Sequence, residues 1–278
     1  MRDYKIVASD LDGTFLNRDG SVSEENWEAV RAMTACGVQF VPCTGRTLHE
    51  MDAEIRDNPA VRYIIHSGGA VVYDKKTDER IEMCIPKAEW NVLLDILNDY
   101  PHLKSVRYDR NVYIAAEQKN EAVYDFFHIS SYSRYKVIPL STPVENFESF
   151  CRSMETVETV GIFFENEEDR AACIERLTRT GSFLLVKWQG LVYIEVCYKT
   201  AGKGNALLML AKRLGYDGAQ TIGVGDSTND LTMIRDAGLG IAVSNACDLL
   251  KEEADEMICS NEEHAIQYIF EHYIKEQN

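Results

Sequence analysis

Short apolar runs alternate with amphipathic stretches over the first 75 residues of the chain. The runs at 6–9, 38–42 and 63–65 are typical of buried strands, because each is brief, apolar and followed by polar or glycine residues. Between the first two, the stretch at 24–36 has the pattern of a helix capped by Ser23. This alternation predicts a parallel sheet with helices on its faces.

The middle of the chain has a different pattern, in which short strands follow one another in pairs. Runs at 105–108 and 112–116 flank Asp109-Arg110-Asn111, a sequence that favours a hairpin turn. A further strand is expected at 135–140, and a helix is expected from Pro143 to about Met154. Paired strands predict an antiparallel sheet with helices on one face, and so a separate α+β module.

The α/β pattern then resumes and continues to the end of the chain. We therefore expect two domains: a doubly wound, Rossmann-like α/β core formed by residues 1–82 and 199–278, and an inserted α+β domain at 83–198.

Composition narrows the classes of partner. The chain has 278 residues and a formal net charge of −16, which argues against nucleic acids and anionic membranes as partners. No apolar run approaches the about 18 residues that a membrane span needs. The predicted strand at the N-terminus leaves no room for a signal peptide. None of the eight cysteines forms a Cys-x-x-Cys pair, so we expect reduced thiols and a cytoplasmic protein, of undetermined oligomeric state.

The first strand ends in two aspartates, Asp10 and Asp12, followed by Gly13. At about 4 Å, two carboxylates repel each other by about 4 kcal/mol at an effective dielectric of 20, and a cation such as Mg²⁺ would relieve this. One aspartate could attack a phosphorus atom while the other moves protons.

Two other structures share the Asp-x-Asp-Gly pattern. An EF-hand loop needs glycine at position 6 and glutamate at position 12, where this chain has Phe15 and Ser21, so it is excluded. An ordinary Asp-Gly turn after a strand fits the stretch equally well, and the rest of the chain has to decide.

Three further polar clusters fall at predicted strand ends or helix starts. Thr44-Gly45-Arg46 follows the second strand, and a helix expected from there to about residue 56 would offer backbone amides to a phosphate. Lys203 would supply positive charge to transferring oxygens. Asp226, in a run with Asn229 and Asp230, would add a hard ligand for Mg²⁺.

Together these clusters resemble the haloacid dehalogenase (HAD) superfamily, in its Cof-like phosphatase branch (subfamily IIB). The resemblance covers the whole chain and lies in four motifs: Asp10-Leu11-Asp12-Gly13-Thr14, Thr44-Gly45-Arg46, Lys203-Gly204-Asn205-Ala206-Leu207, and Gly225-Asp226-Ser227-Thr228-Asn229-Asp230. It implies that the insert is a C2B-type cap between the second and third motifs. One departure is Ser67-Gly68-Gly69-Ala70, where relatives usually carry Asn-Gly-Ala.

The resemblance also implies roles for the clustered residues. Asp10 would be the nucleophile that forms an aspartyl-phosphate, and Asp12 the general acid and base. Mg²⁺ would be held by the side chains of Asp10 and Asp226 and by the backbone carbonyl of Asp12. The phosphoryl group would be held by Thr44, Gly45, Arg46, Lys203 and Asn229, with Asp230 orienting Lys203 or a metal-bound water.

The sequence therefore predicts a Mg²⁺-dependent phosphatase of small phosphorylated metabolites such as sugar phosphates. A phosphomutase or phosphotransferase of the same superfamily is an alternative, and its product would distinguish it. A second alternative is a non-catalytic sugar-phosphate sensor, although the presence of Asp10, Asp12, Lys203 and Asp226 argues against lost chemistry.

Overall fold

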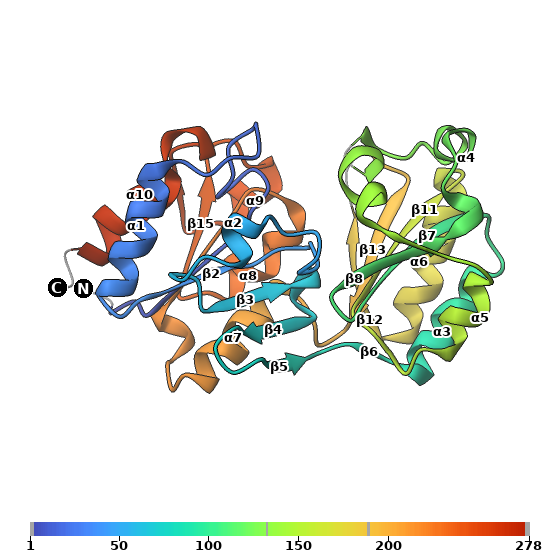
Figure 1. Cartoon of the computed structure of the whole chain (residues 1–278), viewed down its shortest axis with the longest axis horizontal. Helices are drawn as coiled ribbons and strands as arrows, with labels where there is room; N and C mark the ends of the chain where they lie inside the picture. Colours follow the sequence, from blue (N-terminus) through green and yellow to red (C-terminus); the bar gives the residue numbers. More distant parts are fainter. Residues whose placement is uncertain (1–2, 132, 188–189, 276–278) are drawn as a thin grey trace. The chain divides into compact units, whose positions relative to one another are not determined.

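The computed structural model describes residues 3–131, 133–187 and 190–275, which fold into two compact units (Figure 1). Unit 1 comprises Met1–Gly45, Asp52–Glu82 and Gly202–Asn278, and unit 2 comprises Arg46–Met51 and Met83–Ala201. Residues 46–51 are expected in the core, but in the structure they pack with unit 2.

Unit 1 is built around a five-stranded parallel sheet. Its strand order is β16-β15-β14-β1-β2, from Glu256–Ile258, Leu239–Val243, Thr221–Gly225, Ile6–Ser9 and Gln39–Pro42. Strands β1, β14 and β15 are buried along their whole length, as expected for a parallel sheet covered on both faces. This confirms the predicted α/β fold class.

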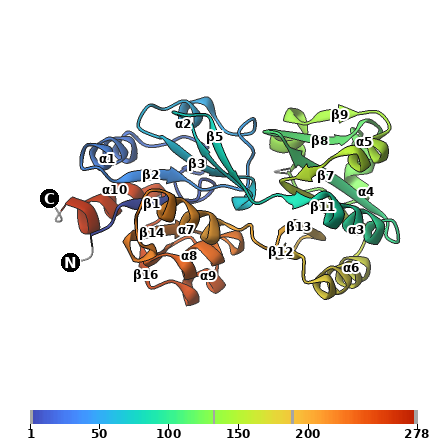
Figure 2. The same ribbon diagram turned by 90° about the horizontal axis from the view of Figure 1, so that it is seen from below.

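Helices cover both faces of this sheet (Figure 2). On one face, α1 (Glu24–Ala35) packs against α10 (Ala265–Ile269), and on the other lie α7 (Lys203–Arg213), α8 (Leu231–Asp236) and α9 (Asp248–Glu253). The Ser23 side chain caps α1 by accepting a hydrogen bond from the Asn26 backbone N–H, as the sequence predicts.

A small antiparallel sheet extends unit 1 beyond β2. It contains β3 (Tyr63–His66), β4 (Val71–Asp74) and β5 (Glu79–Glu82), and a parallel bridge between Cys43 and Ile65 joins it to the end of β2. The helix predicted from residue 46 to 56 is wrong over most of its length, because only α2 (Ala53–Arg56) is helical.

Unit 2 is a six-stranded sheet with helices α3 (Lys87–Leu97), α5 (Phe147–Ser153) and α6 (Glu167–Thr180) packed on one face. The strand order is β12-β13-β11-β7-β8-β9, from Phe183–Lys187, Tyr193–Tyr198, Thr159–Phe164, His102–Tyr108, Asn111–Ala115 and Thr142–Val144. Every pair in it is antiparallel except β8 with β9. A separate pair joins β6 (Ile85–Pro86) to β10 (Thr156–Val157).

Two details of unit 2 differ from the sequence analysis. The strand predicted at 135–140 is wrong: residues 133–140 form short helical turns, and the strand beside β8 is β9 instead. Pro143 does not open a helix but lies in β9, and α5 begins at Phe147. Proline is tolerated there because β9 is an edge strand.

Successive side chains along the strands of unit 2 point to opposite faces of the sheet. Val106 and Val196 belong to the apolar core under the helices, whereas their neighbours Arg107 and Glu195 point to the opposite face. Short helix α4 (Glu121–Phe126) supplies Tyr124 to a small apolar cluster with Leu103 and Phe163 on that second face.

Candidate active site

Three carboxylates meet at one edge of the parallel sheet of unit 1. Asp10 directly follows β1, while Asp226 and Asp230 follow the neighbouring strand β14, and the two strands run parallel in register. One oxygen from each of the three side chains lies within 4.8 Å of the others. The loops after β1 and β14 are thus brought together because the carboxyl ends of parallel strands share one edge.

Lys203 bridges two of these carboxylates. Its Nζ lies 2.5 Å from Asp10 Oδ1 and 2.6 Å from Asp230 Oδ1, and its side chain is only 1% exposed. Burial alone would lower the pKa of Lys203, but the charges of Asp10 and Asp230 outweigh it, so the pKa is raised. The lysine is therefore a fixed positive charge at the first residue of α7.

Backbone groups hold the loop after β14 in place. The backbone N–H groups of Asp226 and Ser227 each donate a hydrogen bond of 3.1 Å to Asp230 Oδ2. Gly225 leaves room for this side chain, since a Cβ at position 225 would lie 2.5 Å from that of Asp230. With Lys203 on its other oxygen, Asp230 is fully buried and fully engaged in orienting its neighbours.

Gly13 is needed at the turn after Asp12 for two reasons. Its φ is +83°, which favours glycine, and a Cβ here would lie 2.6 Å from Asp226 Oδ2. The next residue, Thr14, donates a hydrogen bond of 3.3 Å from its hydroxyl to Asp226 Oδ1. The turn after β1 thus packs directly on the aspartate of the other loop.

The charge balance of this site favours a bound cation. Burial raises the pKa of Asp10 well above its usual range, and although Lys203 opposes this, Asp230, Asp226 and Asp12 add to it. Burial and the charge of Asp230 raise the pKa of Asp226 to about 6. One lysine does not neutralise three clustered carboxylates.

Asn229, which directly precedes Asp230 in the loop after β14, offers a further hard donor. Among the described residues, its Oδ1 is a buried oxygen without a hydrogen-bond partner. Carboxylate and amide oxygens are the donors that Mg²⁺ takes, so this donor set fits a divalent cation.

The other predicted site residues are placed as follows. Asp12 is half-buried in the turn and lies outside the three-carboxylate cluster. Thr44 is buried in unit 1, where its N–H donates to the Ile65 carbonyl and its own carbonyl accepts from the Gly68 N–H. Arg46 belongs to unit 2. No helix begins at Gly45 or Arg46, so the helix start expected there is wrong; both residues lie in a bent loop.

Sequence reasoning missed a glycine that positions Lys203. Gly69 has a φ of +90°, and a Cβ there would lie 2.3 Å from the backbone carbon of Gly202. The preceding Ser67, with a φ of +50°, is also in the left-handed region. The turn therefore lies directly against the backbone at the start of α7. In the sequence, the Ser-Gly-Gly run was the feature that could have indicated this close contact.

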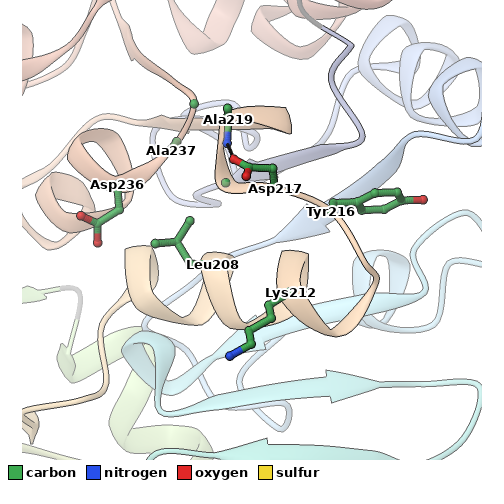
Figure 3. Close-up of a pocket in the computed structure, with 9 residues that line it drawn as sticks. Leu208, Lys212, Tyr216, Asp217, Ala219, Asp236 and Ala237 are labelled. Carbon is green, nitrogen blue, oxygen red and sulfur yellow. Dashed lines mark hydrogen bonds between the residues drawn. The ribbon is translucent and has the colours of Figure 1, made fainter.

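A surface pocket of about 590 Å³ lies elsewhere on unit 1, between the end of α7 and the loops around β14 (Figure 3). Leu208 and Lys212 project from α7, and Asp217 accepts a hydrogen bond of 2.8 Å from the Ala219 N–H. Within the described part of the chain, its lining includes none of the candidate site residues. This pocket and the carboxylate cluster share none of the described residues.

Comparison with known proteins agrees with this geometry. Residues 7–270 match the family model of haloacid dehalogenase-like hydrolases. The chain belongs to this family. It is 27% identical over 292 residues to the Bacillus subtilis protein named 5-amino-6-(5-phospho-D-ribitylamino)uracil phosphatase YwtE, covering 98% of this chain and 99% of the relative. The B. subtilis phosphatase YwpJ is 27% identical, covering 97% of this chain and 100% of the relative.

Solved structures of the family share the whole architecture. A haloacid dehalogenase-like hydrolase from B. subtilis matches with a TM-score of 0.80 at 26% identity, over 97% of this chain and 100% of that one. The subclass IIB sugar phosphatase BT4131 matches with a TM-score of 0.80 at 20% identity, over 97% and 98%, which is a likeness of fold. The predicted family is thus confirmed: the chain is a haloacid dehalogenase-like hydrolase.

None of the helices within residues 3–131, 133–187 and 190–275 combines the length and the apolar character needed to cross a membrane.

Proposed function

We propose that this hydrolase is a Mg²⁺-dependent phosphatase of small phosphorylated metabolites, and that it works through a phosphorylated Asp10. The observation that carries the proposal is a cluster of three carboxylates, two of them buried and paired with one buried lysine, on the loops that follow two adjacent parallel strands. The names of two B. subtilis relatives, each a phosphatase of a phosphorylated ribitylamino-uracil, support a small phosphorylated molecule as substrate.

In the first step, an Asp10 carboxylate oxygen attacks phosphorus and the bond from phosphorus to the ester oxygen breaks. Asp12 donates its proton to the departing oxygen, so the alcohol leaves neutral. Lys203, which lies 2.5 Å from Asp10 Oδ1, holds the nucleophile and compensates charge on the phosphoryl oxygens.

In the second step, the deprotonated Asp12 takes a proton from a water molecule, whose oxygen attacks the phosphorus of the aspartyl-phosphate. The bond between phosphorus and Asp10 breaks, which releases inorganic phosphate and restores both aspartates. Asp12 suits this shuttle because it is half-buried in the turn, two residues after Asp10.

The cation would be held by the carboxylates of Asp10 and Asp226 and by the backbone carbonyl of Asp12. When bound, a divalent cation stabilises the negative charge of the transferring phosphoryl group. Asn229, whose buried Oδ1 is unpaired within the described residues, would face the same ligand shell or the phosphoryl group. Thr44, Gly45 and Arg46 would complete the phosphate contacts.

Residues 83–198 are proposed as the cap that selects the substrate, with the core supplying the chemistry. A phosphate-release screen over a panel of phosphorylated metabolites, with Mg²⁺ and with a chelator, tests the activity. Release that requires Mg²⁺ from a subset of monoesters supports the proposal. An isomerised phosphosugar without net release would favour a mutase, and binding without turnover would favour a sensor.

The covalent step has its own test. After mixing with a good substrate and rapid acid quench, the peptide containing Asp10 should carry the mass of one added phosphoryl group. The Asp10→Asn protein serves as the control and should not. A wild-type enzyme that turns over but never carries this mass, even under single-turnover conditions, would contradict the aspartyl-phosphate.

A further inference from the structure

Unit 2 contains a second buried charged cluster, on the sheet face opposite its helices. The guanidinium of Arg107 lies between two carboxylates: Nε is 3.4 Å from Glu50 Oε2, and Nη1 is 3.5 Å from Glu195 Oε1. The three side chains are only 8%, 4% and 7% exposed, in the order Arg107, Glu50 and Glu195. We call these three residues the anchor triad.

Only one member of the triad lies outside the sheet. Arg107 is in β7 and Glu195 is in β13. Glu50 belongs to Arg46–Met51, a short segment that packs with unit 2 although the rest of unit 2 begins only at Met83. We call Arg46–Met51 the linker segment.

The linker segment forms a turn that is closed on itself. Glu50 Oε2 accepts a hydrogen bond of 2.7 Å from the Thr47 N–H, and the Glu50 N–H donates one of 3.3 Å to Thr47 Oγ1. The Arg46 guanidinium Nη1 lies 3.5 Å from the Glu50 carbonyl oxygen. The Glu50 carboxylate therefore both shapes this turn and ties it to Arg107.

A backbone contact attaches the same segment at a second point. The His49 N–H donates a hydrogen bond of 3.1 Å to the Arg110 carbonyl. Arg110 and Asp109 form the β7–β8 turn with φ of +71° and +44°, a conformation that non-glycine residues keep only where surrounding contacts hold it. The linker segment is thus fastened to the β7–β8 hairpin by a side chain and by a carbonyl.

The chain passes from unit 1 to unit 2 at the bond between Gly45 and Arg46. On one side of this bond, Thr44 is fixed in unit 1 by hydrogen bonds to Ile65 and Gly68. On the other side, the linker segment is fixed to the unit 2 sheet by Glu50. The proposed phosphate loop, Thr44-Gly45-Arg46, therefore continues directly into a segment that is fixed within unit 2.

We infer that Arg107 is a positioning residue for phosphate binding: through Glu50 it fixes the linker segment, and so the conformation of Gly45 and Arg46. This inference rests on the proposed function, since it takes Thr44-Gly45-Arg46 as the phosphate loop. Stability alone does not account for the triad, because a buried ion cluster is commonly no more stable than well-packed apolar residues of similar volume. What the triad adds is a defined position for the segment that carries Glu50.

The triad itself offers a matched pair of variants. Glu50→Gln and Glu195→Gln each remove one buried carboxylate charge from the same guanidinium and keep the side-chain shape, but only Glu50 lies on the linker segment. The probe is inorganic phosphate in the presence of Mg²⁺, measured by calorimetry, together with KM and kcat for an aryl phosphate. Thermal midpoints report the stability cost of each change.

We expect Glu50→Gln to weaken phosphate binding about tenfold and to raise KM similarly, with kcat within about threefold of wild type. Glu195→Gln should lower the thermal midpoint by a similar amount but keep the phosphate Kd within about twofold. Arg107→Lys retains a cation in the cluster but loses the forked contact to both carboxylates, and it should also weaken phosphate binding.

Equal effects of the two glutamine variants on phosphate affinity would overturn the inference, as would an unchanged Kd in Glu50→Gln or Arg107→Lys. So would a wild-type protein that binds no phosphate with Mg²⁺. A wild-type protein that binds phosphate but releases none from any ester would defeat the proposed function only, and the comparison of variants would still decide the role of Arg107.

Discussion

The two units each bury a cation between carboxylates, but the two clusters are built differently. In unit 1, Lys203 lies 2.5 and 2.6 Å from two carboxylates, and a third, Asp226, lies within 4.8 Å of both. In unit 2, Arg107 lies 3.4 and 3.5 Å from its two carboxylates. The first cluster has two more negative charges than positive ones, and the second has one more.

The difference matches two kinds of work. A compact ammonium leaves carboxylate oxygens free for a metal. Burial and the neighbouring carboxylates raise the pKa of Asp10 and Asp226, and a bound cation would stabilise their charged forms. A planar guanidinium instead reaches two partners at once, which suits holding a segment in place. The unit 1 cluster is arranged to bind a ligand, and the unit 2 cluster is arranged to position a piece of chain.

Removing the nucleophile should give the largest effect. Asp10→Asn keeps the side-chain shape but lacks an anionic oxygen, so turnover should fall by at least about a thousandfold, or about 4 kcal/mol in barrier. The fold should survive, because the change also relieves like-charge crowding. In unit 2, Glu195→Gln neutralises a carboxylate beside a cation in the same way and should keep kcat within about twofold. Retention of a tenth of wild-type activity by Asp10→Asn would refute the covalent role.

The next largest effect is expected from removing the cation of each cluster, which tests whether the two clusters differ in their response to Mg²⁺. Lys203→Met and Arg107→Met both leave buried carboxylates without their partner, which is expected to cost about 3–5 kcal/mol of unfolding free energy at neutral pH. Millimolar Mg²⁺ should recover much of the loss in Lys203→Met, since a cation can replace the missing charge there, and little of it in Arg107→Met. Denaturant unfolding with and without Mg²⁺ measures both. Equal recovery in the two variants would erase the proposed distinction.

The pH dependence of metal binding tests the crowding in unit 1 directly. Mg²⁺ binding needs Asp226 in its ionised form. Because the pKa of Asp226 is raised to about 6, the affinity of the protein for Mg²⁺ should fall about tenfold between pH 7 and pH 5. Without metal, the pH dependence of folding stability has the opposite direction. The folded protein keeps the Asp226 proton to a higher pH than the unfolded chain, in which the pKa of this group is 3.8. The free energy of unfolding should therefore fall as pH rises from about 4 to about 6.

Asp226→Asn is the control for this pH series. It should flatten the metal-free stability curve between pH 4 and 6 and abolish most of the thermal shift caused by Mg²⁺. A thermal shift as large as that of wild type would place the metal elsewhere.

The smallest effect is expected at the turn glycine. Gly13→Ala should cost about 1–2 kcal/mol for a non-glycine residue in the left-handed region, and it should weaken Mg²⁺ binding severalfold by displacing Asp226. Gly20→Ala is a matched control, because its φ of +86° imposes the same backbone strain while nothing lies within 4 Å of its Cβ. Identical Mg²⁺ affinities for the two variants would show that the turn at Gly13 does not position the metal ligand Asp226.

Some features of this protein were determined by the sequence itself. The brief apolar runs and the Ser23 cap specify the strands of the parallel sheet and helix α1 with local information alone, because period and capping chemistry act over a few residues. Three of the four polar motifs could likewise be placed after strands, and the Lys203 motif at a helix start; loops after parallel strands share one edge of the sheet. That made Asp10, Lys203, Asp226 and Asp230 recognisable as one group.

Other features were decided only by tertiary structure. No local pattern distinguishes the strand predicted at 135–140 from the helical turns observed there, because the partner of β8 is chosen by the sheet as a whole. Similarly, the polar segment after Gly45 was expected to be helical. Instead, Glu50 contacts Arg107, 57 residues away in sequence, and the segment packs with unit 2. Gly69 gains its importance from the backbone of Gly202. Contacts between residues so distant in sequence depend on the assembled sheets, and periodicity carries no record of them.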